Sequence, residues 1–226
     1  MIDWRRVDTV LLDMDGTLLD LHFDNFFWLE YLPKRYAEIK AIDPELAARK
    51  IHRMTHSIKG SLEWYCTDHW TRTLGVDVVA LKHEVSHKVA TRPYCVDFLD
   101  ALKAAGKDVV MVTNAHQDSL NLKMEKTGIH AKFDRLITVH EFLLPKELPE
   151  CWAEVNHRHA FDPERTLLID DNLRALESAE RYGIAQLLAI SQPDSRAPAQ
   201  QVDGFQAIHS FEEILPVLPS SGGHEP

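Results

Sequence analysis

The sequence has few cysteines, no long apolar run and no excess of positive charge. Its three cysteines, Cys66, Cys95 and Cys151, are odd in number and widely scattered. They make neither a disulfide framework nor a paired zinc motif, which indicates a reducing compartment. The first six residues are too polar for a signal peptide, and no segment approaches the roughly 18 apolar residues that cross a membrane. We therefore expect a cytoplasmic protein with no membrane partner.

The charge balance excludes a second class of partner. The chain has 35 Asp and Glu against 25 Lys and Arg among 226 residues, which gives a formal net charge of −10. A nucleic acid polymer requires a basic surface, so the sequence predicts no such partner. A small phosphorylated metabolite needs only a metal ion and one or two local cations, and we expect a partner of this kind.

Two closely spaced carboxylates follow the first apolar run of the chain. Val10–Leu12 has the pattern of a buried strand, and Asp13 and Asp15 come directly after it, before a turn at Gly16. In an open α/β sheet, ligands bind just beyond the carboxyl ends of the strands. Two anions this close are costly unless a cation joins them or they divide acid and nucleophile roles. The alternative interpretation is a strand end capped by solvated acids.

Strand-like and helix-like segments alternate through most of the chain. The strand-like segments are 7–13, 108–113, 135–138, 166–170 and 184–190. The helix-like segments between the later strands are 96–105, 119–127, 147–160 and 173–182. This alternation favours βαβ units, and we predict an α/β fold with a doubly wound, Rossmann-like parallel sheet.

Residues 20–90 interrupt the alternation. They contain no convincing strand pattern and indicate several helices rich in aromatic residues, most of which we interpret as a small core. We therefore predict a core domain formed by residues 1–19 and 91–226, with an inserted α-helical cap domain formed by residues 20–90. Because the insertion directly follows the first strand, it would overhang the carboxyl end of that strand. Residues 219–226 are predicted to be a disordered tail.

Three more polar sites follow apolar segments. Thr113 and Asn114 end a buried strand and offer a hydroxyl and an amide to phosphoryl oxygens. Lys146 precedes a helix-like segment, where a cation could neutralise charge on a transferring phosphoryl group. Asp170 and Asp171 end another apolar strand. Asp13 and Asp170 together supply the hard oxygen ligands that Mg²⁺ prefers.

The order of these four sites resembles the motif series of the haloacid dehalogenase (HAD) superfamily. The series reads Asp-x-Asp-Gly-Thr, hydrophobic-Thr, Lys and hydrophobic-Asp-Asp, and here it spans nearly the whole chain. The resemblance implies a phosphotransferase with Mg²⁺ as cofactor. It also implies that Asp13 is the nucleophile, forming an aspartyl-phosphate, and that Asp15 is the general acid/base, whose backbone carbonyl also ligates Mg²⁺. Haloalkanoate dehalogenases of the superfamily lack a carboxyl group at the place of Asp15, so this residue favours phosphoryl transfer.

The resemblance assigns roles to the other polar sites as well. Thr113 matches the hydroxyl that orients the phosphoryl group, with Asn114 beside it as a further substrate contact. Lys146 matches the charge-neutralising cation. Asp170 matches the metal-binding acid, and Asp171 is either a water-mediated ligand or a partner of Lys146.

Four runs of the chain look like the bacterial GMP/IMP 5′-nucleotidase branch of the superfamily: 9–21, 23–28, 64–70 and 113–116. This narrower resemblance implies hydrolysis of a purine nucleoside 5′-monophosphate, with Asp24 and Asn25 of the cap as candidates for reading the base. Two alternatives stay open. One is a HAD phosphatase for another small phosphate, such as a sugar phosphate or phosphoglycolate, and the other is a catalytically silent phosphate-binding protein.

A different pattern, His83 to His87, fits the HExxH motif of zinc proteases, which places both histidines on one helix face. No third ligand is evident on a nearby helix, and a chance match is unsurprising in a chain with 13 histidines. We keep zinc catalysis as the less favoured interpretation of this segment.

Overall fold

A six-stranded parallel sheet positions the polar strand ends. The computed structural model describes residues 2–220, and the strand order of its sheet is β3-β2-β1-β4-β5-β6. The strands are β1 (Thr9–Leu12), β2 (Asp108–Thr113), β3 (Arg135–Thr138), β4 (Thr166–Asp170), β5 (Gln186–Ile190) and β6 (Gln206–Ile208). Every neighbouring pair runs parallel. The order reverses beside β1, and such a switch point is where ligands bind in open α/β sheets.

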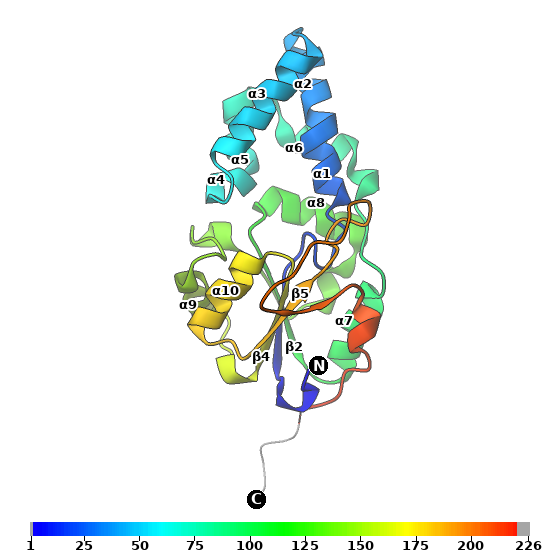
Figure 1. Cartoon of the computed structure of the whole chain (residues 1–226), viewed down its shortest axis with the longest axis vertical. Helices are drawn as coiled ribbons and strands as arrows, with labels where there is room; N and C mark the ends of the chain where they lie inside the picture. Colours follow the sequence, from blue (N-terminus) through cyan, green and yellow to red (C-terminus); the bar gives the residue numbers. More distant parts are fainter. Residues whose placement is uncertain (1, 221–226) are drawn as a thin grey trace, which may run out of the picture.

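Helices cover both faces of this sheet, which confirms the predicted doubly wound α/β fold (Figure 1). The helices around the sheet are α7 (Cys95–Ala104), α8 (Gln117–Thr127), α9 (Pro149–Arg158) and α10 (Leu173–Tyr182). Strand β1 is buried on both faces, which explains its uninterrupted apolar run. Leu12 belongs to a buried cluster with Phe98 of α7, whereas Leu11 belongs to another with Trp152 of α9.

Strand β6 is not among the strands predicted from the sequence. It has only three residues, of which Ile208 alone is buried, and it pairs with β5 alone at one edge of the sheet. An edge strand this short lacks the apolar run by which the other five strands are recognised.

The chain between β1 and α7 forms a helical layer beyond one end of the sheet (Figure 1). Its α-helices are α1 (His22–Phe26), α2 (Leu32–Lys40), α3 (Pro44–Ser57), α4 (Leu62–Tyr65), α5 (Thr67–Leu74) and α6 (Val78–Glu84). Helix α3 begins where the Asp43 carboxylate accepts the backbone N–H of Leu46 at 2.9 Å, an N-cap followed by proline.

This layer has a core of its own. Phe23, Phe27 and Trp70 are almost completely buried in it, and Leu122 of α8 extends the same cluster towards the sheet. The separate core supports our proposal that residues 20–90 form a cap domain on a core made of 1–19 and 91–226.

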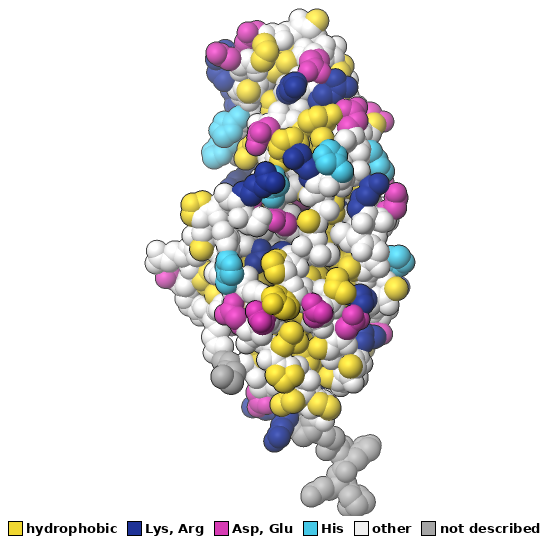
Figure 2. All heavy atoms as spheres, turned by 90° about the vertical axis from the view of Figure 1, so that its right-hand side faces the viewer, with side chains coloured by type: hydrophobic (Ala, Val, Ile, Leu, Met, Phe, Trp, Pro, Cys, Tyr) yellow, Lys and Arg dark blue, Asp and Glu magenta, His cyan; other side chains and the backbone are white. Residues whose placement is uncertain are grey.

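Charged side chains of both signs are interspersed on the face in Figure 2. Within residues 2–220, no helix has the length and apolar character needed to cross a membrane. Of the predicted disordered tail at 219–226, residues 221–226 lie outside the described part of the chain.

Candidate active site

Three neighbouring strands bring the predicted polar residues to the carboxyl end of the sheet. Asp13 follows β1, while Thr113 ends β2 and Asp170 ends β4. Strand β1 lies between β2 and β4, and Leu12 is in register with Met111 and Ile169. Asp13 and Asp170 come next after this register and Thr113 comes two residues after Met111, so all three lie at the carboxyl end of the sheet, where all three are buried.

Lys146 places a buried ammonium group between two of these carboxylates. Its Nζ donates to Asp13 and, at 2.7 Å, to Oδ2 of Asp170. Its backbone N–H donates to Oδ1 of Asn114 at 3.0 Å, and its carbonyl oxygen accepts the hydroxyl of Ser178. The lysine is thus fixed at both its backbone and its side chain, and two buried carboxylates share its charge.

The carboxylates still outnumber the cation. Burial raises the pKa of Asp13 to about 6 against the opposing charge of Lys146, and burial also raises the pKa of Asp170 and Asp171. One oxygen from each of these three aspartates lies within 4.8 Å of the others. A compact set of hard oxygen ligands with excess negative charge fits a divalent cation such as Mg²⁺.

Gly16 allows the first motif to approach Asp171 closely. Gly16 has φ +86°, a conformation that L-residues rarely adopt, and a Cβ atom there would lie 2.5 Å from Oδ2 of Asp171. The hydroxyl of Thr17 accepts the backbone N–H of Asp171 at 3.0 Å. Glycine and threonine of the first motif therefore fit the turn after β1 against the turn after β4.

Asp15 pairs with a different lysine, Lys123. Lys123 of α8 is buried, and its Nζ lies 2.6 Å from Oδ1 of Asp15 and 2.6 Å from Oδ2 of Asp24. Lys82 of α6 donates to the other oxygen of Asp24 at 2.9 Å. Burial, together with the charges of Asp24 and Asp13, raises the pKa of Asp15 to about 6, although Lys123 acts in the opposite direction.

The sequence interpretation missed Lys123 and Lys82. Lys123 stands between Leu120 and Met124 on a buried stripe of α8, and a charged residue on such a stripe is the pattern that could have revealed it.

Glu147 is a further residue that the sequence interpretation missed. Its carboxylate accepts the side-chain amides of Asn114 at 3.0 Å and Asn172 at 2.8 Å, and the hydroxyl of Tyr65 at 3.3 Å. It therefore connects the turns after β2 and β4 with the helical layer. The Asn114 amide is engaged at both ends, by Glu147 and by the backbone of Lys146, so its contact with substrate stays a prediction.

A cavity of about 760 Å³ lies mainly among the helices of the helical layer, and Asp15, Ala115, Ser119 and Lys123 line its side towards the core. Its lining includes Asp15, Lys82 and Lys123, as well as the aromatic side chains of Trp28, Trp64 and Tyr65. This volume is in the range that accommodates small-molecule ligands.

The two predicted base-reading residues also line this cavity, but the protein itself engages both. Asp24 pairs with two lysines, as described above, and Nδ2 of Asn25 donates to Oδ2 of Asp194 at 2.7 Å. Their contact with a base therefore stays a prediction.

The HExxH segment does not lie on a single α-helix. Helix α6 ends at Glu84, and Ser86–Lys88 forms a separate 3-10 turn, so His83 and His87 are not on one helix face. Among residues 2–220, no cluster of three metal-ligating side chains includes either histidine. These findings remove the support for zinc catalysis at this segment.

Comparison with known proteins agrees with this geometry. Residues 7–183 match the family model of haloacid dehalogenase-like hydrolases. The chain is 38% identical over 217 residues to the GMP/IMP nucleotidase YrfG of Escherichia coli, covering 96% of this chain and 98% of that protein. It is 26% identical over 212 residues to the pyrophosphatase PpaX of Bacillus velezensis, covering 84% and 91%.

Solved structures share the fold at low sequence identity. A HAD phosphatase from Thermococcus onnurineus superposes with a TM-score of 0.78 at 19% identity, covering 92% of this chain and 96% of that one. CbbY from Rhodobacter sphaeroides, solved in complex with phosphate, gives a TM-score of 0.65 at 15% identity, covering 92% and 96%.

Proposed function

The chain belongs to the haloacid dehalogenase-like hydrolases and is a phosphomonoester hydrolase, and we propose that it is a Mg²⁺-dependent 5′-nucleotidase for GMP and IMP. The observation that carries the chemistry is the buried Lys146 ammonium between Asp13 and Asp170 at the carboxyl end of the sheet. The identity of 38% to a GMP/IMP nucleotidase over nearly the full length supports the substrate.

Asp13 is the proposed nucleophile. One of its oxygens attacks phosphorus, the ester oxygen leaves, and an aspartyl-phosphate forms that water then hydrolyses. Because Lys146 contacts only Oδ1, the second carboxylate oxygen is left for attack. The same ammonium neutralises charge that develops on the phosphoryl oxygens.

Asp15 is the proposed general acid/base. It would protonate the leaving 5′-oxygen of the nucleoside and later accept a proton from the attacking water. Its pKa, raised to about 6, supports both roles near neutral pH, because the protonated and ionised forms are both accessible there. Thr113 is proposed to orient the phosphoryl group through its hydroxyl.

The three clustered aspartates and the Asp15 backbone carbonyl are the proposed ligands for Mg²⁺. When bound, the ion would neutralise phosphoryl charge and hold the phosphate against the protein groups. The donor set supports this assignment, since all its members are oxygens and three of them lie within 4.8 Å of one another.

The cavity supports a nucleoside as the leaving group. Trp28, Trp64 and Tyr65 are partly exposed on its wall and offer aromatic surface on which a purine can stack, whereas Trp70 is buried in the core of the helical layer. A 6-oxopurine presents an acceptor at O6 and a donor at N1, and adenine reverses this pattern. A site that pairs with one pattern can discriminate against the other by as much as about 10⁴-fold.

The test is kcat/KM for GMP, IMP, AMP, CMP, several sugar phosphates and pyrophosphate under one condition with Mg²⁺. GMP and IMP should exceed all the others, and a chelator should abolish every activity. If AMP matches GMP, or if a sugar phosphate or pyrophosphate exceeds both, the nucleotidase assignment fails while the phosphatase chemistry stands. Hydrolysis that persists in chelator would contradict the proposed metal.

A further inference from the structure

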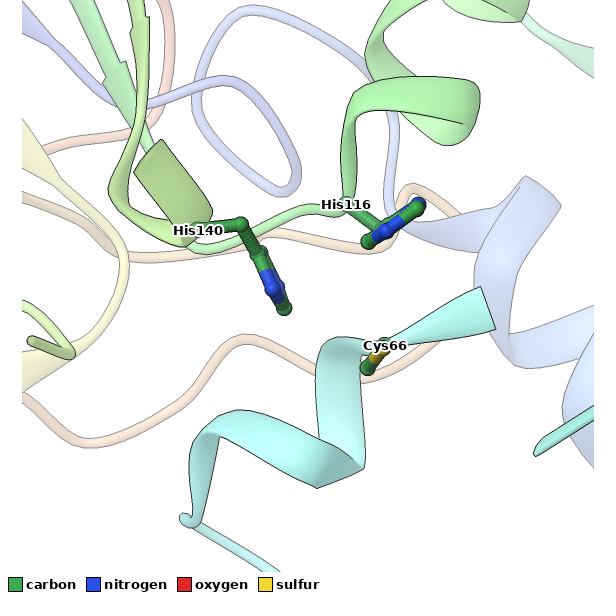
Figure 3. Close-up of side chains that lie close together, drawn as sticks. All are labelled: Cys66, His116 and His140. Atoms are coloured by element: carbon green, nitrogen blue, oxygen red, sulfur yellow. The ribbon is translucent and has the colours of Figure 1, made fainter. Parts of the chain in front are cut away.

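Three soft-metal ligands meet where the helical layer touches the core, outside the aspartate cluster (Figure 3). Cys66 directly precedes α5, His116 caps the start of α8, and His140 lies in the short turn after β3. One ligand atom from each side chain lies within 4.8 Å of the others, and the two imidazole rings are 5.1 Å apart between centroids. Three separate segments of the chain thus deliver a thiol and two imidazoles to one place.

Each imidazole has a hydrogen-bond partner that orients it. Nε2 of His140 lies 3.1 Å from the carbonyl oxygen of Asn114, and a proton donated there leaves Nδ1 with its lone pair. Nδ1 of His116 lies 2.7 Å from the hydroxyl of Thr67, which in turn donates to Asp118 at 3.3 Å. Nδ1 also accepts the backbone N–H of Asp118 at 3.5 Å, so Nε2 of His116 has a free lone pair when Nδ1 instead carries the proton and donates it to Thr67. Metal-bound histidines in proteins are oriented by such outer partners.

The local charge also favours a cation. Burial lowers the pKa of His140, which favours the neutral imidazole that binds metal ions. The carboxylate of Asp68 lies 3.9 Å from Nε2 of His116 and that of Asp118 lies 3.2 Å from Nδ1. Two carboxylates therefore border the cluster and add negative potential.

We propose that Cys66, His116 and His140 form a second metal site, selective for a thiolate- and imidazole-seeking divalent ion of the Zn²⁺ class. Zn²⁺ takes these ligands at about 2.0–2.3 Å, so binding requires small side-chain rotations that shorten the separations between ligand atoms. Asp68, whose carboxylate lies 3.9 Å from Nε2 of His116, could supply the fourth ligand. The site differs in kind from the all-oxygen aspartate cluster, because Mg²⁺ competes poorly for sulfur and imidazole nitrogen.

An ion at this site would join the helical layer to the core. Cys66 belongs to the helical layer, whereas His116 and His140 follow β2 and β3 of the sheet. Tyr65 and Thr67, on either side of Cys66, line the cavity described above. Zn²⁺ would therefore hold one wall of the cavity against the core. If release of product requires this wall to move, bound Zn²⁺ should slow turnover.

Cobalt binding tests the site without reliance on enzyme activity. The wild-type protein, reduced and held in excess Mg²⁺, is titrated with Co²⁺ and followed by absorption. We expect one equivalent to produce the visible bands of a tetrahedral ion together with a thiolate-to-cobalt charge-transfer band. C66S should lose the charge-transfer band, and H140A should weaken Co²⁺ binding by more than about 100-fold, beyond the loss typical of outer-shell partners. H130A, which removes an exposed histidine, is the matched control and should bind as the wild type does.

Three results would overturn the proposal: no charge-transfer band in the folded wild-type protein, the same band in C66S, or unchanged affinity in H140A. The wild-type titration decides the matter even if one variant fails to fold, because it needs no substitution. As a second measurement, Zn²⁺ should raise the Tm of the wild type and of H130A but not that of C66S or H140A. An equal rise in all four proteins would also contradict the site.

Discussion

Nζ of Lys123 lies 2.6 Å from Oδ1 of Asp15, although 108 residues separate the two along the chain. The same ammonium group is 2.6 Å from Asp24, which belongs to the helical layer. Lys123 therefore connects the proposed acid/base carboxylate of the core with a carboxylate of the insertion. All three side chains lie at the cavity, so the position of Asp15 depends on how the layer sits against the sheet.

Replacing this lysine should damage both activity and stability. K123M leaves Asp15 without its ion-pair partner and Asp24 with Lys82 alone, so we expect a large fall in kcat. We also expect a loss of about 3 kcal/mol in the free energy of unfolding, since breaking a buried pair leaves an uncompensated charge. Denaturant unfolding and steady-state kinetics measure the two effects. K126M, on an exposed part of the same helix, should show neither, and near-normal kcat in K123M would contradict the connection.

The nucleophile assignment is tested at Asp13. D13N should abolish turnover while preserving the fold, because an amide oxygen is a poor nucleophile towards phosphorus and Lys146 keeps its contact with Asp170. Beryllium fluoride should form its adduct on Asp13, as located by crystallography or mass spectrometry. D203N, at an exposed carboxylate, is the control and should retain activity. An adduct on any other residue would exclude the assignment.

The sequence predicts the site residues that directly follow strands better than those that lie on helices or in other turns. Asp13, Thr113 and Asp170 are predictable because each one ends or follows an apolar run, and parallel strands bring such ends together. Glu147 has no comparable pattern, and the buried stripe of α8 marks Lys123 as unusual without indicating its partners. Lys123 reaches Asp15 only through the packing of α8 beneath the helical layer, and Glu147 acquires its three partners only when separate turns meet. Their roles depend on tertiary contacts that local periodicity does not encode.

An ion pair at the opposite end of β1 predicts a dependence of stability on pH. Arg165 donates to both carboxylate oxygens of Asp8, at 2.9 Å in one of the two contacts, and this lowers the pKa of Asp8 from 3.8 to about 2. The pair thus stabilises the fold above the unfolded pKa, and the contribution disappears as pH falls from about 4 to about 2. Both side chains are partly exposed, so solvent screening keeps the contribution small.

This expectation is checked with D8N. The difference in the free energy of unfolding between wild type and D8N should be near its maximum at neutral pH and should shrink as the solution is acidified. D203N, an exposed carboxylate away from the ion pair, controls for the loss of one negative charge. A difference that stays constant through the acid range would show that the pair contributes no pH-linked stability.

Gly16 offers a test of the close approach between the first and last motifs. G16A places a Cβ atom 2.5 Å from Oδ2 of Asp171 and forces alanine into a left-handed conformation. We expect the aspartate cluster to be displaced and activity to be lost. G106A is the matched control, because Gly106 also has positive φ (+69°) but has no atom within 4 Å of its would-be Cβ. It should cost about 1–2 kcal/mol of stability and leave kcat intact. If G16A and G106A lose activity equally, backbone strain alone explains the effect.

The aromatic cavity wall should select the substrate without performing the chemistry. Trp64 is partly exposed on this wall, and its ring lies 4.8 Å from that of Tyr65 between centroids. If a purine stacks there, W64A should raise KM for GMP about tenfold or more, since base–aromatic stacking contributes about 1–3 kcal/mol. Hydrolysis of p-nitrophenyl phosphate should change little, because its small leaving group does not require a purine platform. Y94A, which removes an exposed aromatic ring outside the cavity, should leave both substrates unaffected. Equal losses on GMP and p-nitrophenyl phosphate in W64A would mean that Trp64 supports the helical layer and does not contact the base.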